Sequence, residues 1–131
     1  MRLSRKAFGT EGERLAADYL IKKGYTLVAQ NFYTRFGEID LIVSRSGELI
    51  FVEVKTRTPD SAARFGRASS AVDHRKQTRI SRSAAVFLEQ NPGYSDVNYR
   101  FDVIEVYRGV GDHWDVRHIE DAFSCVNGIY I

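Results

Sequence analysis

Residues 37–57 have the sequence Gly-Glu-Ile-Asp-Leu-Ile-Val-Ser-Arg-Ser-Gly-Glu-Leu-Ile-Phe-Val-Glu-Val-Lys-Thr-Arg. Two apolar runs, 39–43 and 49–54, flank the dipeptide at positions 46 and 47, Ser-Gly. Such a dipeptide suits the two-residue turn of a β-hairpin. The stretch therefore predicts two antiparallel strands joined by a tight turn.

The predicted hairpin brings charged side chains together. A turn at residues 46–47 places Asp40 directly opposite Glu53, with the two side chains about 5 Å apart on one face. Because side chains alternate along a strand, Lys55 shares that face. A turn at residues 47–48 would pair Asp40 with Lys55 and keep all three groups together, whereas a three-residue turn would separate Asp40 from Glu53.

Both faces of this hairpin are otherwise apolar. One is expected to carry Ile39, Leu41, Val43, Ile50, Val52 and Val54, and the other Ile42, Leu49 and Phe51 beside the two carboxylates. Apolar residues on both faces are typical of strands covered on both sides. Carboxylates in that setting repel each other, and desolvation costs each on the order of several kcal/mol. A shared proton, the Lys55 ammonium or a divalent cation must compensate them.

Length and composition indicate one soluble domain. The 131 residues suffice for one core, and 44% are hydrophobic and 27% charged. No apolar run approaches the roughly 20 residues of a membrane span, and the segment after Met1 is too polar for a signal peptide. Cys125 is the single cysteine, which excludes an internal disulfide. These features predict a cytoplasmic protein without a membrane partner.

Charge is unevenly distributed along the chain. The basic middle segment carries one acid, Asp73, against six basic residues: Arg64, Arg67, Arg75, Lys76, Arg79 and Arg82. Residues 102–121 carry six acids against two arginines. This asymmetry indicates either a face for an anionic partner or an ordinary solvated helix face.

The remaining patterns predict the fold. Helical spacing of apolar residues indicates helices at 9–23 and 74–90, the second capped by Asp73, and alternation indicates further strands at 25–32, 97–107 and 113–119. Residues 58–71 are expected to form a loop beside the functional site. The order helix, three-strand meander, helix, two strands predicts one α/β domain (1–131, core 8–123) with a mixed sheet and helices on both faces.

Two carboxylates with a lysine two residues beyond one of them suit metal-assisted phosphodiester hydrolysis. Mg²⁺ or Mn²⁺ prefers oxygen ligands, which Asp40, Glu53 and the backbone carbonyl of Val54 supply. The ion would stabilise charge on the phosphate and activate a bound water, and Lys55 could orient that water or neutralise the phosphate.

The same residues resemble a known family. Glu13 in an early helix, the Gly-Glu-Ile-Asp run at 37–40, the Phe-Val-Glu-Val-Lys-Thr-Arg run at 51–57 and the segment 76–80 are similar to the YraN-type proteins of the PD-(D/E)XK nuclease superfamily, near the Holliday junction resolvases. The resemblance covers roughly residues 8–123 and implies a restriction-endonuclease-like core. It places Asp40, Glu53 and Lys55 at catalytic positions, and Glu13 at the acid of the resolvase branch. Ile39 stands where the motif has proline.

These observations predict a Mg²⁺- or Mn²⁺-dependent nuclease acting on DNA, with branched or flap structures as candidate substrates. Two cuts at a junction would require two sites and hence favour a homodimer. Phosphate contacts are expected from Arg57, Arg64, Arg67, Arg75, Lys76, Arg79 and Arg82. The alternatives are a catalytically silent module that binds nucleic acid or a partner, and a metal-free interaction domain.

Each candidate residue also has a structural interpretation. Asp40 and Glu53 could form an ion network with Lys55 and Arg57, and Glu13 could favour the helix dipole. Asp102 is expected to pair with Arg100 or a basic residue of the second helix. The three histidines, His74, His113 and His118, lack a metal-ligand spacing and are expected at the surface or at helix caps. Tyrosines are expected in core and hairpin packing rather than in base stacking.

Overall fold

The computed structural model describes residues 5–57, 72–109, 111 and 113–126, with side chains from Thr10 onward. Its elements are α1 (Arg5–Lys22), β1 (Thr26–Thr34), β2 (Gly37–Arg45), β3 (Glu48–Arg57), α3 (His74–Gln90), the short 3₁₀ helix η2 (Pro92–Tyr94), β4 (Asn98–Arg108) and β5 (Trp114–Phe123). The predicted loop 58–71, with Arg64 and Arg67, lies outside these residues. None of the described helices is long and apolar enough to cross a membrane.

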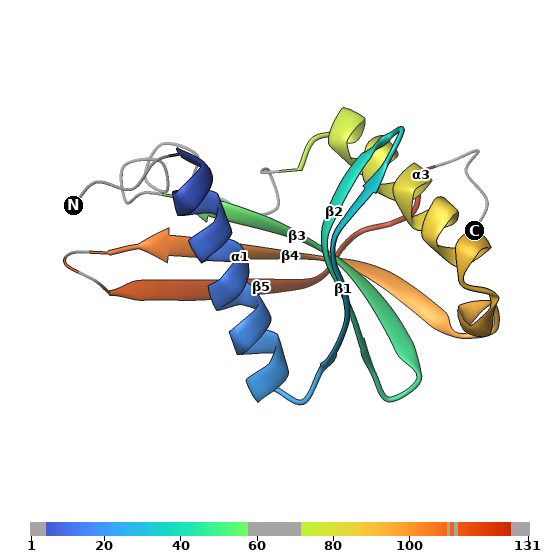
Figure 1. Cartoon of the computed structure of the whole chain (residues 1–131), viewed down its shortest axis with the longest axis horizontal. Helices are drawn as coiled ribbons and strands as arrows, with labels where there is room; N and C mark the ends of the chain where they lie inside the picture. The colour runs from blue at the N-terminus through green and yellow to red at the C-terminus, as the bar shows by residue number, and fades with distance from the viewer. Residues whose placement is uncertain (1–4, 58–71, 110, 112, 127–131) are drawn as a thin grey trace.

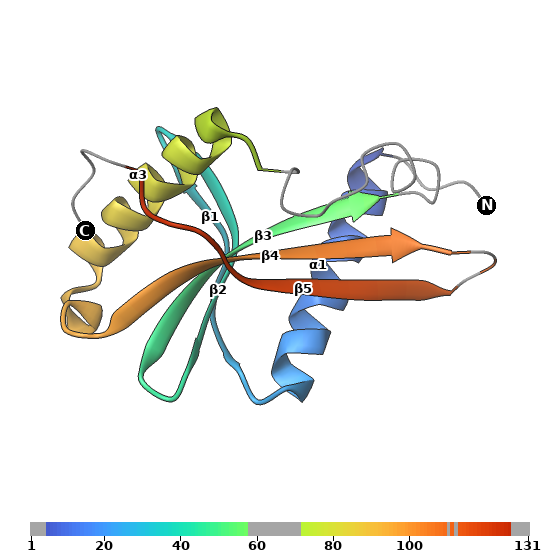
Figure 2. The ribbon, with the colours of Figure 1, turned by 180° about the vertical axis from the view of Figure 1, so that it is seen from behind.

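A five-stranded mixed sheet organises the domain (Figure 1). Its spatial order is β1-β2-β3-β4-β5, and every neighbouring pair is antiparallel except β3 and β4, which are parallel. The parallel pair needs a crossover, which contains α3. Helix α1 covers the face seen in Figure 1, and α3 covers the opposite face seen in Figure 2. The predicted order of a helix, a three-strand meander, a helix and two strands, in a mixed sheet with a helix on each face, is confirmed.

Each face of the sheet contributes to its own apolar core. The core under α1 contains Leu41, Val43, Ile50, Val52 and Val54, as the alternation predicts. The core under α3 contains Ile42, Leu49 and Phe51, again as predicted, together with Ile39. The prediction for Ile39 is wrong, because the alternation of β2 breaks around Asp40.

The hairpin between β2 and β3 has the predicted turn. Ser46 and Gly47 both have positive φ, 53° and 77°, as a tight two-residue hairpin turn of the primed type requires. The register pairs Ile42 with Phe51 and ends at Leu41 and Val52. One residue further, Asp40 is not part of this ladder, so the predicted direct pairing with Glu53 is wrong.

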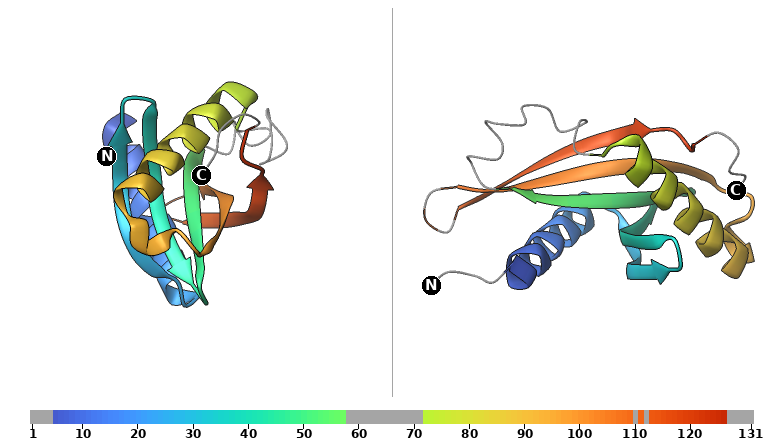
Figure 3. Two further views of the ribbon diagram at one scale, coloured as in Figure 1. Left: turned by 90° about the vertical axis from the view of Figure 1, so that its right-hand side faces the viewer. Right: turned by 90° about the horizontal axis from the view of Figure 1, so that it is seen from above.

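The sheet forks at this point. Beyond Leu41, strand β2 continues its pairing with β1 as far as Gly37, while β3 continues its pairing with β4 as far as Arg57. The strong twist of the sheet, seen along the chain of strands in Figure 3, accompanies this separation. Two buried strands thus diverge where the charged side chains lie.

Most predicted boundaries lie within about two residues of the observed ones, but α1 begins four residues earlier than predicted, at Arg5, and β5 is longer than predicted. It extends to Phe123 because pairing with β4 continues through an irregularity between Phe101 and Val103. Asp121 adopts a positive φ of 52° there, and its backbone N–H donates to the Asp102 carboxylate at 2.9 Å. A side chain of β4 therefore supports this part of the edge strand.

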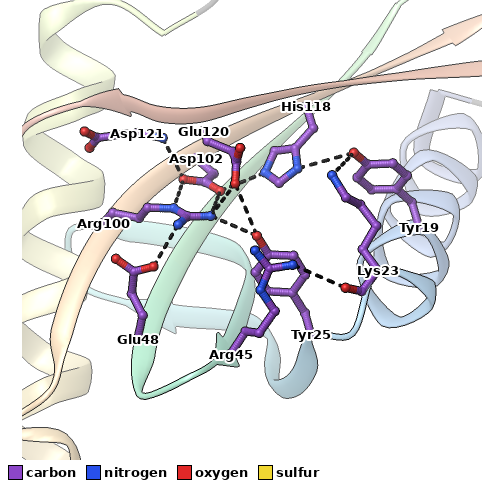
Figure 4. A network of polar contacts seen from close by, with 10 residues as sticks. All are labelled: Tyr19, Lys23, Tyr25, Arg45, Glu48, Arg100, Asp102, His118, Glu120 and Asp121. Atoms are coloured by element: carbon purple, nitrogen blue, oxygen red, sulfur yellow. Dashed lines mark hydrogen bonds and ion pairs between the residues drawn. The ribbon is translucent and has the colours of Figure 1, made fainter.

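Asp102 is the centre of a buried polar network (Figure 4). The residue is 0% exposed, and Arg100 donates to both of its carboxylate oxygens, at 2.9 and 3.1 Å. Arg100 also pairs with Glu48 at 2.7 Å and Glu120 at 3.0 Å. The predicted pairing of Asp102 with Arg100 is confirmed.

His118 extends this network toward α1. Its Nε2 lies 2.7 Å from the Asp102 carboxylate, and its Nδ1 lies 3.4 Å from the hydroxyl of Tyr19. A neutral ring with its proton on Nε2 satisfies both contacts, with Tyr19 as donor to Nδ1. The prediction of a surface role for His118 is wrong: its side chain is 3% exposed.

We expect Arg100→Met to lower the free energy of unfolding by about 3–5 kcal/mol, because it leaves the buried Asp102 carboxylate without its cation. Urea denaturation measures this change. Arg75→Met removes an exposed arginine from α3 and is the matched control, expected to change stability by less than about 0.5 kcal/mol. Equal effects of the two substitutions would contradict a stabilising role for the network.

Candidate metal and catalytic site

The Asp40 carboxylate occupies the fork between β2 and β3. Its Oδ2 accepts a hydrogen bond from the backbone N–H of Val54 at 2.8 Å, and the residue is 9% exposed. The side chain thus satisfies a backbone donor that the hairpin ladder no longer pairs on that side. This contact fixes the carboxylate on β3 despite the separation of the two strands.

Helix α1 reaches the fork because Gly12 lies against β3. A methyl group at Gly12 would collide with the hydroxyl of Thr56, so the helix can approach this closely only with glycine there. The next residue, Glu13, consequently lies at the fork. One carboxylate oxygen from each of Glu13, Glu38 and Asp40 lies within 4.8 Å of the others.

Asn31 on β1 bridges two of these acids. With its amide oriented for hydrogen bonding, the nitrogen donates to Glu38 Oε1 at 3.2 Å and to Glu13 Oε1 at 3.1 Å. Its backbone has a positive φ of 50°, a conformation that asparagine tolerates better than most residues. The irregular backbone of the edge strand thereby turns the amide toward the acids. Sequence reasoning missed this residue.

Glu53 is held by two lysines on the other side of the fork. The carboxylate is nearly buried, and its Oε1 lies 3.6 Å from Lys55 Nζ and 3.3 Å from Lys76 Nζ. Lys76 is positioned by the start of α3, where its backbone N–H donates to the N-cap Asp73 at 2.8 Å. Helix α3 thus supplies a second ammonium group, that of Lys76, to the predicted catalytic acid Glu53.

Basic side chains of the described residues do not fully compensate the acids at the fork. Burial and then the negative charge of Glu53 raise the pKa of Asp40 to about 9, although the Val54 N–H opposes the shift. Partial burial and then the charges of Glu38 and Glu53 raise the pKa of Glu13. Among the residues that the structure describes, no ion pair joins Glu13, Glu38 or Asp40 to a basic side chain.

Asp102 forms a second acidic group with His118 and Glu120. Its pKa is shifted in the opposite direction from that of Asp40. Burial alone would raise its pKa, but hydrogen bonds from His118 and Arg100 lower it below the ordinary value of 3.8. Arg100 thus already supplies the cation at that group. Of these two acidic groups, the one at the fork has no ion pair with a basic side chain of the described residues.

The predicted phosphate-binding residues fall into different positions. Arg75, Arg79 and Arg82 are exposed on α3, whereas Arg57 donates to Glu105 at 2.6 Å and is 13% exposed. Arg57 therefore has a structural partner on β4. Arg64 and Arg67 lie beyond the described part of the chain.

Glu38 and Asn31 enlarge the site beyond the predicted residues. Glu38 stands two positions before Asp40 in the quoted stretch, a spacing that the two-residue period of a strand could have revealed. Asn31 gives no such signal, because its contribution depends on the pairing of β1 with β2 and on its left-handed backbone.

The fold and the site together define a class: a single α/β domain with carboxylates from α1, β2 and β3 gathered where its sheet divides. Residues 12–106 match the family described as "Uncharacterised protein family UPF0102". A UPF0102 protein of Alkaliphilus oremlandii is 44% identical over 119 residues, covering 90% of this chain and 98% of the relative. One from Caldanaerobacter subterraneus subsp. tengcongensis is 43% identical over 106 residues, or 81% and 84% of the two chains. The chain belongs to the UPF0102 family.

A solved structure, that of Pyrococcus furiosus SfsA in complex with Ca²⁺, is similar at a TM-score of 0.40 with 13% identity. The similarity covers 85% of this chain and 63% of the SfsA chain. It is too low to assign a common fold by itself.

We expect Asp40→Asn to stabilise the metal-free protein at neutral pH, by more than about 1 kcal/mol, the scale of one pKa unit. The folded protein keeps the Asp40 proton up to about pH 9, whereas the unfolded chain releases it near 3.8. Ionisation therefore favours the unfolded chain increasingly between these values, and the gain from asparagine should grow with pH. Urea denaturation with a chelator, between pH 5 and pH 9, measures the difference.

Asp102→Asn is the matched control for this experiment. Since the folded pKa of Asp102 is lowered, its carboxylate stabilises the protein above pH 3.8, and the same substitution should destabilise it at neutral pH. Destabilisation by Asp40→Asn across the whole pH range would contradict the uncompensated state of the fork.

Proposed function

We propose that this protein is a Mg²⁺- or Mn²⁺-dependent nuclease that hydrolyses DNA phosphodiester bonds at the fork between β2 and β3. The observation that carries the proposal is that β2, β3 and α3 bring the buried acids Asp40 and Glu53 together with two partly exposed lysines, Lys55 and Lys76. This is the constellation that the resemblance to PD-(D/E)XK nucleases predicts.

The donor set fits a hard divalent cation. Carboxylate and carbonyl oxygens are the ligands that Mg²⁺ and Mn²⁺ prefer. Asp40 belongs both to the expected set, with Glu53 and the Val54 carbonyl, and to the acidic group with Glu13 and Glu38. A cation at Asp40 would balance the like charges that raise the pKa of its carboxyl.

When bound, the ion would supply Lewis-acid stabilisation of the phosphate and a water of lowered pKa. The protein supplies the rest. Asp40 is locked by the Val54 N–H, so its carboxylate needs no reorganisation. Lys55 is 30% exposed, close enough to solvent to meet a phosphate or an attacking water while it contacts Glu53.

Lys76 has a different role in this proposal. Its ion pair with Glu53 connects α3 to the proposed catalytic acid, and its side chain is 38% exposed. Arg75, Arg79 and Arg82 continue this positive surface along α3 and favour a polyanionic substrate. Branched or flap DNA is the proposed substrate class, and the homodimer that two cuts would require stays a prediction.

Glu53→Gln is expected to reduce metal-dependent cleavage at least about 100-fold, the scale of losing a group that acts on the transition state. Cleavage of a fluorescent panel of duplex, single-stranded, flap and four-way DNA measures this. Glu89→Gln, an exposed acid of α3, is the control and should leave cleavage unchanged. Retained cleavage by purified Glu53→Gln would remove Glu53 from the mechanism.

Mg²⁺ or Mn²⁺ is expected to raise the thermal midpoint of the wild type, because a ligand of the folded state stabilises it by mass action. Asp40→Asn should lose this response, and Asp102→Asn should keep it. Salt-dependent DNA binding without cleavage of any substrate in the panel, and without a metal response, would instead favour the catalytically silent module.

A further inference from the structure

Tyr33 is the most exposed large apolar side chain in the described part of the chain. It is 73% exposed, compared with 50% for Ile21. Single exposed apolar residues are ordinary, so exposure alone assigns nothing to it. Its position relative to the acids at the fork is what distinguishes it.

The strand register fixes Tyr33 beside the site. Tyr33 on β1 pairs directly with Glu38 on β2, and the preceding pair, Phe32 with Ile39, packs in the core under α3. Because neighbouring residues of a strand face opposite ways, Tyr33 and Glu38 point to the α1 side, where Glu13 lies. The neighbouring Glu38 carboxylate raises the pKa of the Tyr33 hydroxyl.

The turn that follows Tyr33 is anchored and basic. Thr34 Oγ1 lies 2.8 Å from Ser83 Oγ on α3, so the tip of the β1–β2 hairpin contacts that helix (Figure 1). The Phe36 ring lies under two guanidinium groups, with Cζ of Arg35 and Arg82 at 4.7 and 5.4 Å from its centroid. A positive surface from two elements therefore begins directly beyond Tyr33.

We propose that Tyr33 is a stacking platform for an unpaired nucleobase next to the scissile phosphate, with the flanking backbone directed to Arg35 and Arg82. This inference rests on the proposed nuclease function and gives its site a preference for flap or single-stranded DNA.

The preference for unpaired DNA follows from which base faces are accessible for stacking. In a continuous duplex both faces of a base are covered by its neighbours, so an aromatic side chain can stack only on a base that has left the stack. Stacking on a protein aromatic contributes about 1–3 kcal/mol per base, or about 5- to 150-fold in affinity. Because Tyr33 lies in a strand paired with β2, its backbone is already ordered, which reduces the entropy lost on binding.

The test measures binding separately from cleavage. In a Glu53→Gln background with Mg²⁺, flap DNA with 2-aminopurine at the unpaired position next to the junction is compared with the same label in a full duplex. Stacking on Tyr33 quenches the label, and anisotropy gives the affinity. Tyr33→Ala should lose the quench and weaken flap binding about 5- to 150-fold, with less than about a 2-fold change for duplex.

Two further variants keep the result interpretable. Tyr33→Phe retains the ring and should retain the quench and the preference for flap DNA. Ile21→Ala removes the other exposed apolar side chain and should behave like its parent. Equal effects of Tyr33→Ala on flap and duplex DNA, or an unchanged quench, would overturn the proposal.

Failure of this inference differs from failure of the proposed function. If Tyr33 has no stacking role, the Tyr33→Ala variant of the otherwise unaltered chain will cleave flap and duplex DNA in the parental ratio. If the protein is not a nuclease, no Mg²⁺-dependent cleavage will occur, while the dependence of flap binding on Tyr33 can still be measured.

Discussion

The hydrogen bond from the Val54 N–H to the Asp40 carboxylate is the contact on which the site depends. Two central strands cannot separate inside a core without leaving backbone donors unpaired, and an unpaired buried donor is costly. Asp40 satisfies one such donor where the β2–β3 ladder has ended. Because the carboxylate accepts this bond, the same group that permits the fork is fixed there as a candidate metal ligand.

The two acidic groups, around Asp102 and around Asp40, differ in the basic side chains that compensate their negative charge. Around Asp102, the Arg100 guanidinium supplies the countercharge, and the network ties β3, β4 and β5 together. Around Asp40, the acids Glu13 of α1 and Glu38 of β2 gather with the amide of Asn31 between them. The pKa values of Glu13 and Asp40 are raised. The first arrangement stabilises the fold. The second retains an electrostatic cost, as expected where a protein binds a cation or performs chemistry.

The quoted stretch 37–57 determined much of this by local rules. Opposed apolar runs with a turn at Ser46 and Gly47 define the hairpin, and β-alternation places Leu41 and Phe51 under different helices. Helical spacing with Asp73 as N-cap defines α3. Such features depend on neighbours a few residues apart, which is why a sequence reveals them.

Long-range contacts decided the rest. The sequence by itself determined the element order, the hairpin register and the candidate acids Asp40 and Glu53. Only the tertiary structure shows that Asp40 lies outside the ladder and accepts from Val54. It also shows the ion pairs of Lys76 with Glu53 and of Arg57 with Glu105. It also added Asn31 through a left-handed residue of an edge strand. The physical reason is that twist, backbone irregularity and the partners of buried charges arise from packing between distant segments, which no local periodicity encodes.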